Sequence, residues 1–374
     1  MINVNSLRPL SGDGKKLFIE TYGCQMNVGD SEIVVSIMQG EGYFYTDNIE
    51  EADVILINTC SIRDNAEQRI WGRLTEMRRL RKRKPSLLIG IIGCMAERLK
   101  EELLESGKGV DIVAGPDTYR DLPKLCREAE SGGKGINTLL STEETYADIA
   151  PVRLDKNGVS GFISIMRGCN NFCAYCVVPY TRGRERSRDA ATIIAEAKSL
   201  FENGYREVTL LGQNVNSYNK DLDESQRFPA LLRAINALPG EFIIRFMTSH
   251  PRDCTRELIE AMADCKKVAK HLHLPVQSGN NRVLKEMNRH YDREKYLSLI
   301  DYAYEIMPEL SITSDVIVGF PGETYEQFRD TLSLVEQVKY TSLFTFIFSA
   351  RPGTAANEMD DPVSRQEKGK WFKE

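Results

Sequence analysis

The sequence predicts an α/β protein with an N-terminal domain built on an open parallel α/β sheet, followed by a partial (β/α)6 barrel. Short apolar runs alternate with longer amphipathic stretches along almost the whole chain. One of these runs, residues 53–58, is apolar enough to be buried on both faces, as strands of a parallel sheet are. The alternation stops once, between residues 132 and 158, a stretch that is rich in Gly, Thr, Glu, Asp and Pro. We interpret this stretch as a linker and expect domains at residues 1–148 and 149–365, with a tail at 366–374.

The N-terminal region alternates strands and helices in order. Strands are expected where a short apolar run is bounded by turn residues, and helices where apolar residues recur every three or four positions. The expected strands are 16–22, 53–58, 87–92 and 111–114, and the expected helices are 30–39, 61–82, 96–105 and 117–130. Because each strand is joined to the next by a helix, the sheet should be mostly parallel, with helices on both faces.

The second region repeats this pattern in six units. The expected strands are 160–166, 207–211, 242–247, 269–274, 311–318 and 342–348. The expected helices are 190–202, 228–238, 255–264, 281–287, 293–306 and 325–338. A closed barrel of this type has eight units, so these predict a partial barrel with its site at the C-terminal ends of the strands.

The composition limits the class of protein. The 374 residues are 41% hydrophobic and 28% charged, which is typical of a globular protein. The first residues do not resemble a signal peptide, and no apolar run approaches the ~20 residues that span a bilayer. We therefore expect a cytoplasmic protein without a membrane partner. In that compartment, nine cysteines indicate metal or redox chemistry rather than disulfides.

Cys169, Cys173 and Cys176 form a C-x3-C-x2-C array on one short segment. Three thiolates this close can bind three irons of a 4Fe–4S cluster and leave the fourth iron open to a small molecule. Zinc is the main alternative, but a structural zinc site needs four protein ligands, and the nearest following His is His250. The array resembles the signature of the radical S-adenosylmethionine (SAM) enzymes, in which the open iron binds SAM.

Three more cysteines, Cys24, Cys60 and Cys94, come just after the first, second and third predicted strands. Parallel strands end at one edge of the sheet, where open α/β sheets bind ligands. Each of these cysteines also precedes a predicted helix, whose N-terminal amides favour negative charge. We infer a second cluster, because the suitability of short residues for such turns explains one cysteine but not three in phase. Ordinary structural roles are expected for Cys126, Cys254 and Cys265.

Basic residues are concentrated in two places, although the net charge of −5 does not by itself indicate a nucleic-acid binder. The run at 78–84 is either the solvated end of a helix stopped by Pro85 or a contact with a nucleic-acid backbone, and the sequence does not decide between them. A second set follows the cysteine array directly, and we expect it to act at the site by binding phosphate or the SAM carboxylate. It consists of Arg182, Arg184, Arg186 and Arg188.

The predicted barrel strands end in polar loops. The side chains there that could bind the amino, ribose and adenine groups of SAM are Gln213, Asn214, Ser249 and Gln277. A structural role in a turn is an equal alternative for each of them. His250 is interpreted as a hydrogen-bonded turn residue rather than a catalytic one. His271 and His273 alternate on one strand and are expected to line the barrel without binding metal.

With both cysteine triads placed, the chain resembles the radical-SAM methylthiotransferases over nearly all of its length. The motifs that carry the resemblance are residues 21–27, 58–63, 93–94, 169–184, 211–216, 272–279 and 348–354. Within that family, the 24–27 stretch is closest to the type that acts on isopentenylated adenosine of tRNA. Its relatives modify a ribosomal protein or threonylcarbamoyladenosine instead.

The resemblance implies that a methylthio group is added to C2 of N6-isopentenyladenosine at position 37 of tRNA. It implies SAM and two 4Fe–4S clusters as cofactors, one on each cysteine triad. Adenine C2 carries no acidic proton, so the hydrogen is removed by a 5′-deoxyadenosyl radical made from SAM at the 169–176 cluster. The other cluster would carry sulfur, which a further SAM methylates. No catalytic residue is assigned beyond the cluster ligands.

The implied partners are the anticodon stem–loop of tRNA and an electron donor such as flavodoxin or ferredoxin. The target base would have to leave the stack of the anticodon loop and enter the space between the domains. Arg182 and Arg184 are the residues expected to contact the nucleic acid. Members of the family usually carry a C-terminal RNA-binding (TRAM) domain, which we expect to be absent from this chain.

Two other functions stay open at this point. The first is the same chemistry on threonylcarbamoyladenosine of tRNA or on a ribosomal protein, which mass spectrometry of the products would distinguish. The second is a non-catalytic iron–sulfur protein that carries electrons or binds RNA. A barrel of six units is more scaffold than an electron carrier needs, and formation of 5′-deoxyadenosine would exclude this class.

Overall fold

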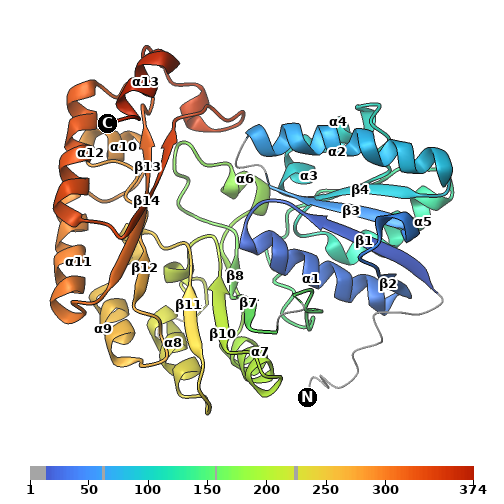
Figure 1. Cartoon of the computed structure of the whole chain (residues 1–374), viewed down its shortest axis with the longest axis horizontal. Helices are drawn as coiled ribbons and strands as arrows, with labels where there is room; N and C mark the ends of the chain where they lie inside the picture. The colour runs from blue at the N-terminus through green and yellow to red at the C-terminus, as the bar shows by residue number, and fades with distance from the viewer. Residues whose placement is uncertain (1–13, 61–63, 156–157, 223–225) are drawn as a thin grey trace. The chain divides into compact units, whose positions relative to one another are not determined.

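Figure 1 shows the computed structural model of the chain, which describes residues 14–60, 64–155, 158–222 and 226–374. The chain forms two compact units, one of Met1–Ser164 with Tyr180–Ser199 and the other of Ile165–Pro179 with Leu200–Glu374. Each unit has its own parallel strands with helices between them. The predicted α/β class is therefore confirmed.

Within the described residues, the first unit contains a six-stranded sheet in the order β2-β1-β3-β4-β5-β6. All its neighbouring strands are parallel. The strands are β1 Lys15–Thr21, β2 Tyr43–Tyr45, β3 Val54–Thr59, β4 Leu88–Gly93, β5 Ile112–Ala114 and β6 Gly135–Asn137. β3 and β4 are buried at every position, as expected of central strands covered on both faces.

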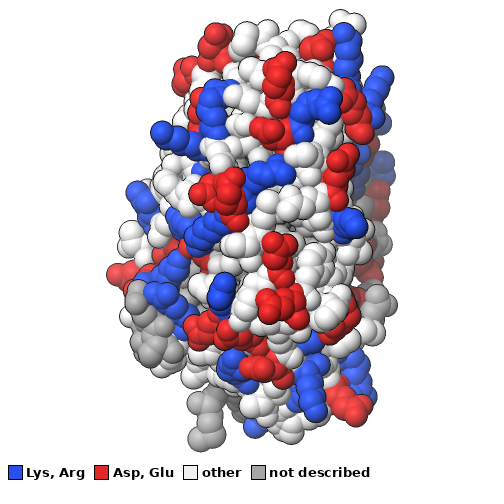
Figure 2. All heavy atoms as spheres, turned by 90° about the vertical axis from the view of Figure 1, so that its left-hand side faces the viewer, with Lys and Arg blue, Asp and Glu red and all other residues white. Residues whose placement is uncertain are grey.

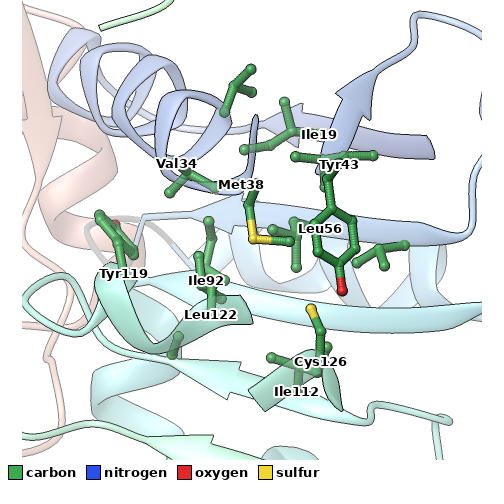
Figure 3. Packing of buried hydrophobic residues seen from close by; sticks show 14 of the residues in the cluster. Ile19, Val34, Met38, Tyr43, Leu56, Ile92, Ile112, Tyr119, Leu122 and Cys126 are labelled. Carbon is green, nitrogen blue, oxygen red and sulfur yellow. The ribbon is translucent and has the colours of Figure 1, made fainter. Parts of the chain in front are cut away.

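Helices cover both faces of this sheet. They are α1 Gln25–Gly40, α2 Asp64–Arg83, α3 Cys94–Leu99, α4 Glu101–Glu105 and α5 Leu122–Glu130. Side chains of β3 alternate between the faces: Leu56 packs with Val34 of α1, as Figure 3 shows, whereas Ile55 and Ile57 pack with Leu74 of α2. Burying one such aliphatic side chain stabilises the fold by about 1.5–3 kcal/mol. Two separate apolar clusters therefore hold the sheet edge that follows β1, β3 and β4 in place.

Short elements follow the sheet along the chain. They are β7 Ser160–Ser164, β8 Met166–Arg167, α6 Val178–Arg182 and β9 Arg186–Ser187, with the longer helix α7 Ala190–Glu202 after them. The cysteine array at 169–176 lies between β8 and α6. It therefore lies on irregular backbone rather than inside a helix or strand.

The second unit alternates parallel strands with helices, as a partial barrel requires. Its strands are β10 Glu207–Leu211, β11 Ile243–Phe246, β12 His271–His273, β13 Ser311–Val318 and β14 Ser342–Ile347. Its helices are α8 Phe228–Asn236, α9 Arg256–Asp264, α10 Asn281–Glu286, α11 Arg293–Ile306, α12 Tyr325–Val338 and α13 Arg365–Trp371. The strand pairs β10–β11, β12–β13 and β13–β14 are parallel. A parallel bridge between Ile244 and Val268 connects β11 to the segment that precedes β12.

Several predicted helices coincide with observed ones, and others differ at their ends. Helices 190–202, 293–306 and 325–338 lie where the sequence placed them. The helix expected at 30–39 already begins at Gln25. The helix expected at 96–105 is divided at Lys100, whose φ of 45° interrupts it. The first residues of the helix expected at 61–82 lie outside the described residues.

The sequence did not predict β2, β6 or α13. β6 lies in the stretch interpreted as a linker, yet Gly135 pairs with Ile112 of β5, so that interpretation is wrong for this part of the stretch. Strands of three residues at the end of a sheet are too short to show a period. Residues 366–371 of the expected tail are helical, and Trp371 stacks on Phe328 with ring centroids 5.8 Å apart.

The described surface gives two results that bear on partners. Across the described ranges, each helix is too short or too polar to cross a membrane. Figure 2 shows the side of the molecule that carries α11 and α12, where acidic and basic side chains are interspersed. A mixed surface of this kind produces no field of one sign that would attract a polyanion, so this face is not the basic surface that RNA binding needs.

Candidate functional site

Cys24, Cys60 and Cys94 lie at one edge of the first sheet. Cys24 precedes α1 as its N-cap, Cys60 follows β3, and Cys94 is the first residue of α3. β1, β3 and β4 are adjacent in the sheet, so the three cysteines that follow them come together. Cys60 donates a hydrogen bond to the Cys24 sulfur, and a Cβ atom on Gly23 would lie 2.4 Å from Cys60 Cβ. The edge predicted from the sequence thus carries three thiols from three neighbouring strands.

The environment of these thiols favours negative charge at the edge. The hydrogen bond from Cys60 lowers the pKa of Cys24 to about 6, against the effect of burial, and the Arg182 charge and backbone amides of α1 contribute to the lowering. Burial raises the pKa of Cys94, and the Arg182 charge opposes this effect. Cys24 is therefore the thiolate of this edge at neutral pH.

Two glycines before these cysteines are required by close packing. Gly93 has φ 88° and ψ −154°, a backbone conformation that only glycine adopts without strain. A Cβ atom there would lie 2.5 Å from Asn58 Oδ1 and 2.8 Å from the Thr59 carbonyl oxygen. Gly23 has φ 117° and faces Cys60. The Gly–Cys pairs in the sequence therefore reflect the approach of β1 and β4 to the end of β3.

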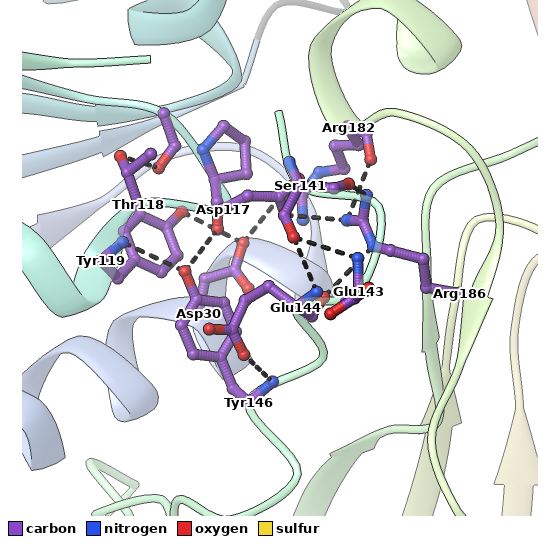
Figure 4. Close-up of polar contacts among 12 residues, drawn as sticks. Asp30, Asp117, Thr118, Tyr119, Ser141, Glu143, Glu144, Tyr146, Arg182 and Arg186 are labelled. Atoms are coloured by element: carbon purple, nitrogen blue, oxygen red, sulfur yellow. Dashed lines mark hydrogen bonds and ion pairs between the residues drawn. The ribbon is translucent and has the colours of Figure 1, made fainter. Parts of the chain in front are cut away.

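Arg182 reaches this edge from α6 and is buried there, with 3% of its side chain exposed. Its Nη2 atom is 2.8 Å from Asp30 Oδ2, and it also donates to Asn27 Oδ1 at 3.2 Å. Its Nε atom donates to Cys94 Sγ at 3.2 Å. Tyr119 donates its hydroxyl to the same carboxylate oxygen of Asp30, at 3.3 Å (Figure 4). The guanidinium therefore connects a buried carboxylate to a candidate ligand.

Asn27 and Asn58 connect the segments that carry Cys24 and Cys60 through buried hydrogen bonds. Both are completely buried. Asn27 donates to the Tyr22 carbonyl oxygen and to Asn58 Oδ1, while Asn58 donates to the Asn27 carbonyl oxygen at 2.8 Å. Cys24 Sγ lies 3.4 Å from Asn27 Oδ1. These amides fix the start of α1 against the end of β3, and nothing in the sequence singles them out beyond their place in the motifs.

The other arginines of the 182–188 set have different positions. Arg186 is buried and ion-paired with Asp117 at 2.8 Å, and it also bonds backbone carbonyls of the 141–144 segment (Figure 4). Arg188 is buried and paired with Glu196 at 2.7 Å. The expectation that the whole set binds phosphate or carboxylate of a ligand is therefore wrong for Arg186 and Arg188, which are neutralised by acidic side chains of the protein. Arg184 is exposed.

The run at 78–84 is at the C-terminal end of α2, as its simpler interpretation predicts. Arg81 pairs with Asp111 and donates to the Leu87 carbonyl oxygen. Lys84 pairs with Asp53 at 2.6 Å. These two side chains attach the C-terminal end of α2 to neighbouring segments of the sheet. Contact with nucleic acid is therefore not needed to explain their positive charge.

The second cysteine triad is fastened to the second unit by backbone and side-chain contacts. The Ala174 amide donates to the Met287 carbonyl oxygen at 3.0 Å, and Asn288 donates to the Phe172 carbonyl oxygen at 2.9 Å. Arg289 is buried, and its Nη1 atom lies 3.4 Å from Cys173 Sγ. The segment after α10 therefore holds the loop that carries Cys169, Cys173 and Cys176.

The two loops that follow β10 and β11 are bonded to each other. The Val215 amide donates to the Thr248 carbonyl oxygen at 3.0 Å. Asn216 donates to the His250 carbonyl oxygen at 2.9 Å and accepts from the His250 amide at 3.0 Å. Thr248 has a φ of 70°, which is strained for a β-branched residue. Strain of this kind is concentrated at ligand sites.

These loops bury polar atoms that have no hydrogen-bond partner among the described residues. The atoms are Gln213 Oε1, Asn214 Oδ1, Ser249 Oγ and His250 Nε2. Leaving such an atom unpaired costs about 1–3 kcal/mol, so a group of them indicates a polar ligand. The structure thus brings together three of the residues predicted to bind SAM. Gln277 lies separately, after β12, where its backbone N–H donates to the Asp315 carbonyl oxygen.

Glu323 is a buried carboxyl group that the sequence did not single out, although its loop was noted as polar. Its Oε2 atom accepts from the Gly319 amide at 2.6 Å and the Phe320 amide at 3.3 Å, while Oε1 has no partner among the described residues. Burial raises the pKa of Glu323 to about 7, although these amides oppose the shift. Its partnered oxygen fixes the 319–323 turn.

The histidines have structural contacts. His250 Nδ1 accepts from the Arg252 amide at 3.1 Å, which confirms a hydrogen-bonded turn residue. His271 and His273 both lie within 3.1 Å of Thr313 Oγ1. Among the residues described, no three Cys, His, Asp or Glu side chains are arranged to bind a single metal ion. A 4Fe–4S cluster makes a different demand, because each cysteine binds a different iron.

His250 is expected to stay neutral from pH 8 down to about pH 4 in the folded protein. Burial lowers the pKa of His250 to about 2, and the Arg289 charge adds to the effect. The unfolded chain binds the proton below its ordinary pKa of about 6.5, so stability should fall by up to ~1.4 kcal/mol per pH unit below that value. The ring proton shifts of His250, measured by NMR, should not change between pH 5 and 8. A titration midpoint near 6.5 would contradict the burial.

Comparison with known proteins connects both sites to families. Residues 163–335 match the Radical SAM superfamily, and residues 16–115 match a family described as Uncharacterized protein family UPF0004. A tRNA-2-methylthio-N(6)-dimethylallyladenosine synthase of Parabacteroides distasonis is 52% identical over 358 residues, which are 95% of this chain and 78% of the relative. One from Amoebophilus asiaticus is 54% identical over 363 residues, 93% of this chain and 75% of the relative.

The chain belongs to the tRNA-2-methylthio-N(6)-dimethylallyladenosine synthase family. The predicted resemblance to the radical-SAM methylthiotransferases is therefore confirmed, and the chain is an enzyme of that class. Membership of the Radical SAM superfamily implies SAM and a 4Fe–4S cluster as cofactors. Non-catalytic electron carriers and RNA-binding proteins are thereby excluded as alternatives.

Solved structures of low sequence identity share the fold of this family member. The radical SAM methyltransferase TsrM from Kitasatospora setae, with cobalamin and a [4Fe-4S] cluster bound, has a TM-score of 0.68 at 14% identity and covers 92% of this chain and 77% of its own. The cobalamin-dependent radical enzyme OxsB has a TM-score of 0.64 at 13% identity and covers 92% of this chain and 54% of its own. These similarities extend to the fold alone.

Proposed function

We propose that this chain adds a methylthio group to C2 of N6-isopentenyladenosine at position 37 of tRNA, using SAM and two 4Fe–4S clusters. The proposal is carried by relatives that are 52% identical over 95% of the chain and are named for this product. The two cysteine triads supply the cluster sites that the product requires. We assign one cluster to the domain predicted at 1–148 and the other to that predicted at 149–365.

The 169–176 loop fits the cluster that binds SAM. Its three thiols have no fourth cysteine in the motif, so one iron stays available to a ligand. The atoms of Gln213, Asn214 and Ser249 that have no partner in the described part of the chain provide acceptors and a hydroxyl for the amino and ribose groups of SAM. We propose Gln277 as a further contact, on its place after β12.

The edge formed by Cys24, Cys60 and Cys94 fits a second cluster. A thiolate, two further thiols and a buried guanidinium whose Nη1 has no partner among the described residues suit a group that carries sulfide and negative charge. This cluster would hold the sulfur that becomes the methylthio group. Asn27 and Asn58 would keep the three sulfur atoms at a fixed spacing.

The proposed chemistry explains why a radical cofactor is needed. The hydrogen on adenine C2 is not acidic, so a general base cannot remove it as a proton. When bound, SAM and the 169–176 cluster supply an organic radical that can remove an unactivated hydrogen. The role of the chain is then to hold both cofactors and to exclude water from them. Electrons would come from a small donor such as flavodoxin or ferredoxin.

Iron counting and product analysis test the proposal. Anaerobic reconstitution should give about 8 irons per chain, whereas about 4 would contradict a second cluster. Incubation with SAM, a reductant and an anticodon stem–loop containing isopentenyladenosine should give the methylthio nucleoside by mass spectrometry. A product from threonylcarbamoyladenosine tRNA or a ribosomal protein, and none from this substrate, would assign the alternative substrate.

Replacing Arg184 by alanine is expected to weaken tRNA binding through the loss of one phosphate contact. Arg184 is exposed on the segment that follows the cysteine array, and we retain it as the proposed nucleic-acid contact. The slope of log K against log salt should fall by about 1. Fluorescence anisotropy with a labelled stem–loop at several salt concentrations measures it. Arg186→Lys is the control, since Arg186 is buried against Asp117, and an equal change in both variants would contradict the assignment.

A further inference from the structure

Arg182 was expected to contact nucleic acid, but the structure encloses it within the first unit. Only 3% of its side chain and 1% of that of Asp30 are exposed, and their ion pair is 2.8 Å long. Taking two charges out of water is costly, and a buried pair often stabilises the fold no more than apolar residues of the same size. The pair therefore calls for an explanation other than stability.

The hydrogen bonds of the guanidinium leave one of its nitrogens unused. Nε donates to Cys94 Sγ at 3.2 Å, and Nη2 donates to Asn27 and Asp30. Nη1 is buried and has no partner among the described residues. A guanidinium is a rigid planar fork, so its Nη1 donors are fixed in direction once the other two nitrogens are held.

We propose that Arg182 is a positioning residue of the second cluster, donating to the Cys94 sulfur and offering Nη1 to a cluster sulfur. The inference rests on the proposed cluster at Cys24, Cys60 and Cys94. Asp30 and Tyr119 hold the guanidinium in place, so that it presents its donors without moving. Hydrogen bonds and positive charge at cluster sulfurs stabilise the reduced state, which raises the reduction potential.

Arg186 provides a matched comparison within the same segment. It is also buried, at 4% exposed, and is paired with Asp117, whose side chain is 0% exposed. It donates to the Glu144 and Arg182 carbonyl oxygens and to the Asp117 carboxylate. A role in fold stability alone would make the two arginines equivalent, whereas a role at the cluster would separate them.

The test uses the full chain with Cys169, Cys173 and Cys176 replaced by alanine, so that a single cluster is left. In this background, Arg182→Gln is combined with Asp30→Asn, which avoids leaving an uncompensated charge in the interior. Arg182→Lys keeps the charge without the planar fork, and Arg186→Lys is the control. The reduction potential of the reconstituted cluster is measured by redox titration with electron paramagnetic resonance, and circular dichroism verifies folding.

We expect a more negative potential in the double variant, a smaller shift in Arg182→Lys and no shift in Arg186→Lys. Equal potentials in all four proteins would overturn the inference while leaving the second cluster in place. A parent protein that is folded but binds no iron would overturn the second cluster, and the inference with it. A shift in Arg186→Lys as large as that in Arg182→Lys would also overturn it, since a general loss of packing would then be the cause.

Discussion

Replacing Cys94 by alanine is expected to halve the iron content, from about 8 to about 4 per chain, and to abolish methylthiolation. Cys94 is the first residue of α3 and lies within hydrogen-bond distance of Arg182, at the edge shared with Cys24 and Cys60. Two thiols cannot hold a cluster that needs three. The 169–176 loop belongs to the other unit, so 5′-deoxyadenosine should still form from SAM. Iron analysis and liquid chromatography of the products measure these outcomes.

Cys126→Ala is the matched control for Cys94→Ala. Cys126 is fully buried on α5 and packs in the same apolar cluster as Tyr43 and Met38 (Figure 3). Burial raises its thiol pKa to about 12, so it stays protonated and is a poor ligand. The variant should retain about 8 irons and full product formation. Loss of 5′-deoxyadenosine in Cys94→Ala would contradict separate roles for the two triads.

The fold could be predicted where a helix or strand is long enough for its hydrophobic period to repeat in the sequence. Helices 293–306 and 325–338 have a clear helical period, and the latter begins with a Thr324–Gln327 capping box that can be read from the sequence. Strands β2 and β6 have three residues each and owe their existence to pairing with β1 and β5. Pairing partners are not encoded locally, so no reading of these segments alone predicts them.

The site could be predicted as far as strand ends determine it. Three cysteines after three adjacent parallel strands must share an edge, and the structure places them there. Arg182 was predicted to contact nucleic acid or a ligand phosphate, because it follows the cysteine array in a basic segment. Its burial depends on Asp30, which is 152 residues away in the sequence and gives no local signal. Arg289 was missed for the same reason, since its contact with Cys173 joins distant segments.

Gly93 deserves the same test as the cysteine that follows it, because its conformation positions the ligand. Its φ of 88° and ψ of −154° lie in a region that is essentially restricted to glycine. An added Cβ would lie 2.5 Å from Asn58 Oδ1, and Asn58 is completely buried and bonded to Asn27. The neighbour therefore cannot move aside without breaking the amide network under Cys24 and Cys60.

Gly93→Ala is accordingly expected to lower stability and to lose the second cluster together. Backbone strain alone costs roughly 1–3 kcal/mol, and the clash with Asn58 adds to it. Gly72→Ala is the control, since Gly72 is exposed on α2 and an added Cβ would meet no described atom within 4 Å outside its own helix backbone, and it should gain about 0.4–1 kcal/mol. Urea unfolding of both apo variants and their iron content after reconstitution measure the effects. Full iron retention in Gly93→Ala would show that the end of β3 can shift to accommodate the added Cβ. The spacing of the cysteine ligands would then not depend on this glycine.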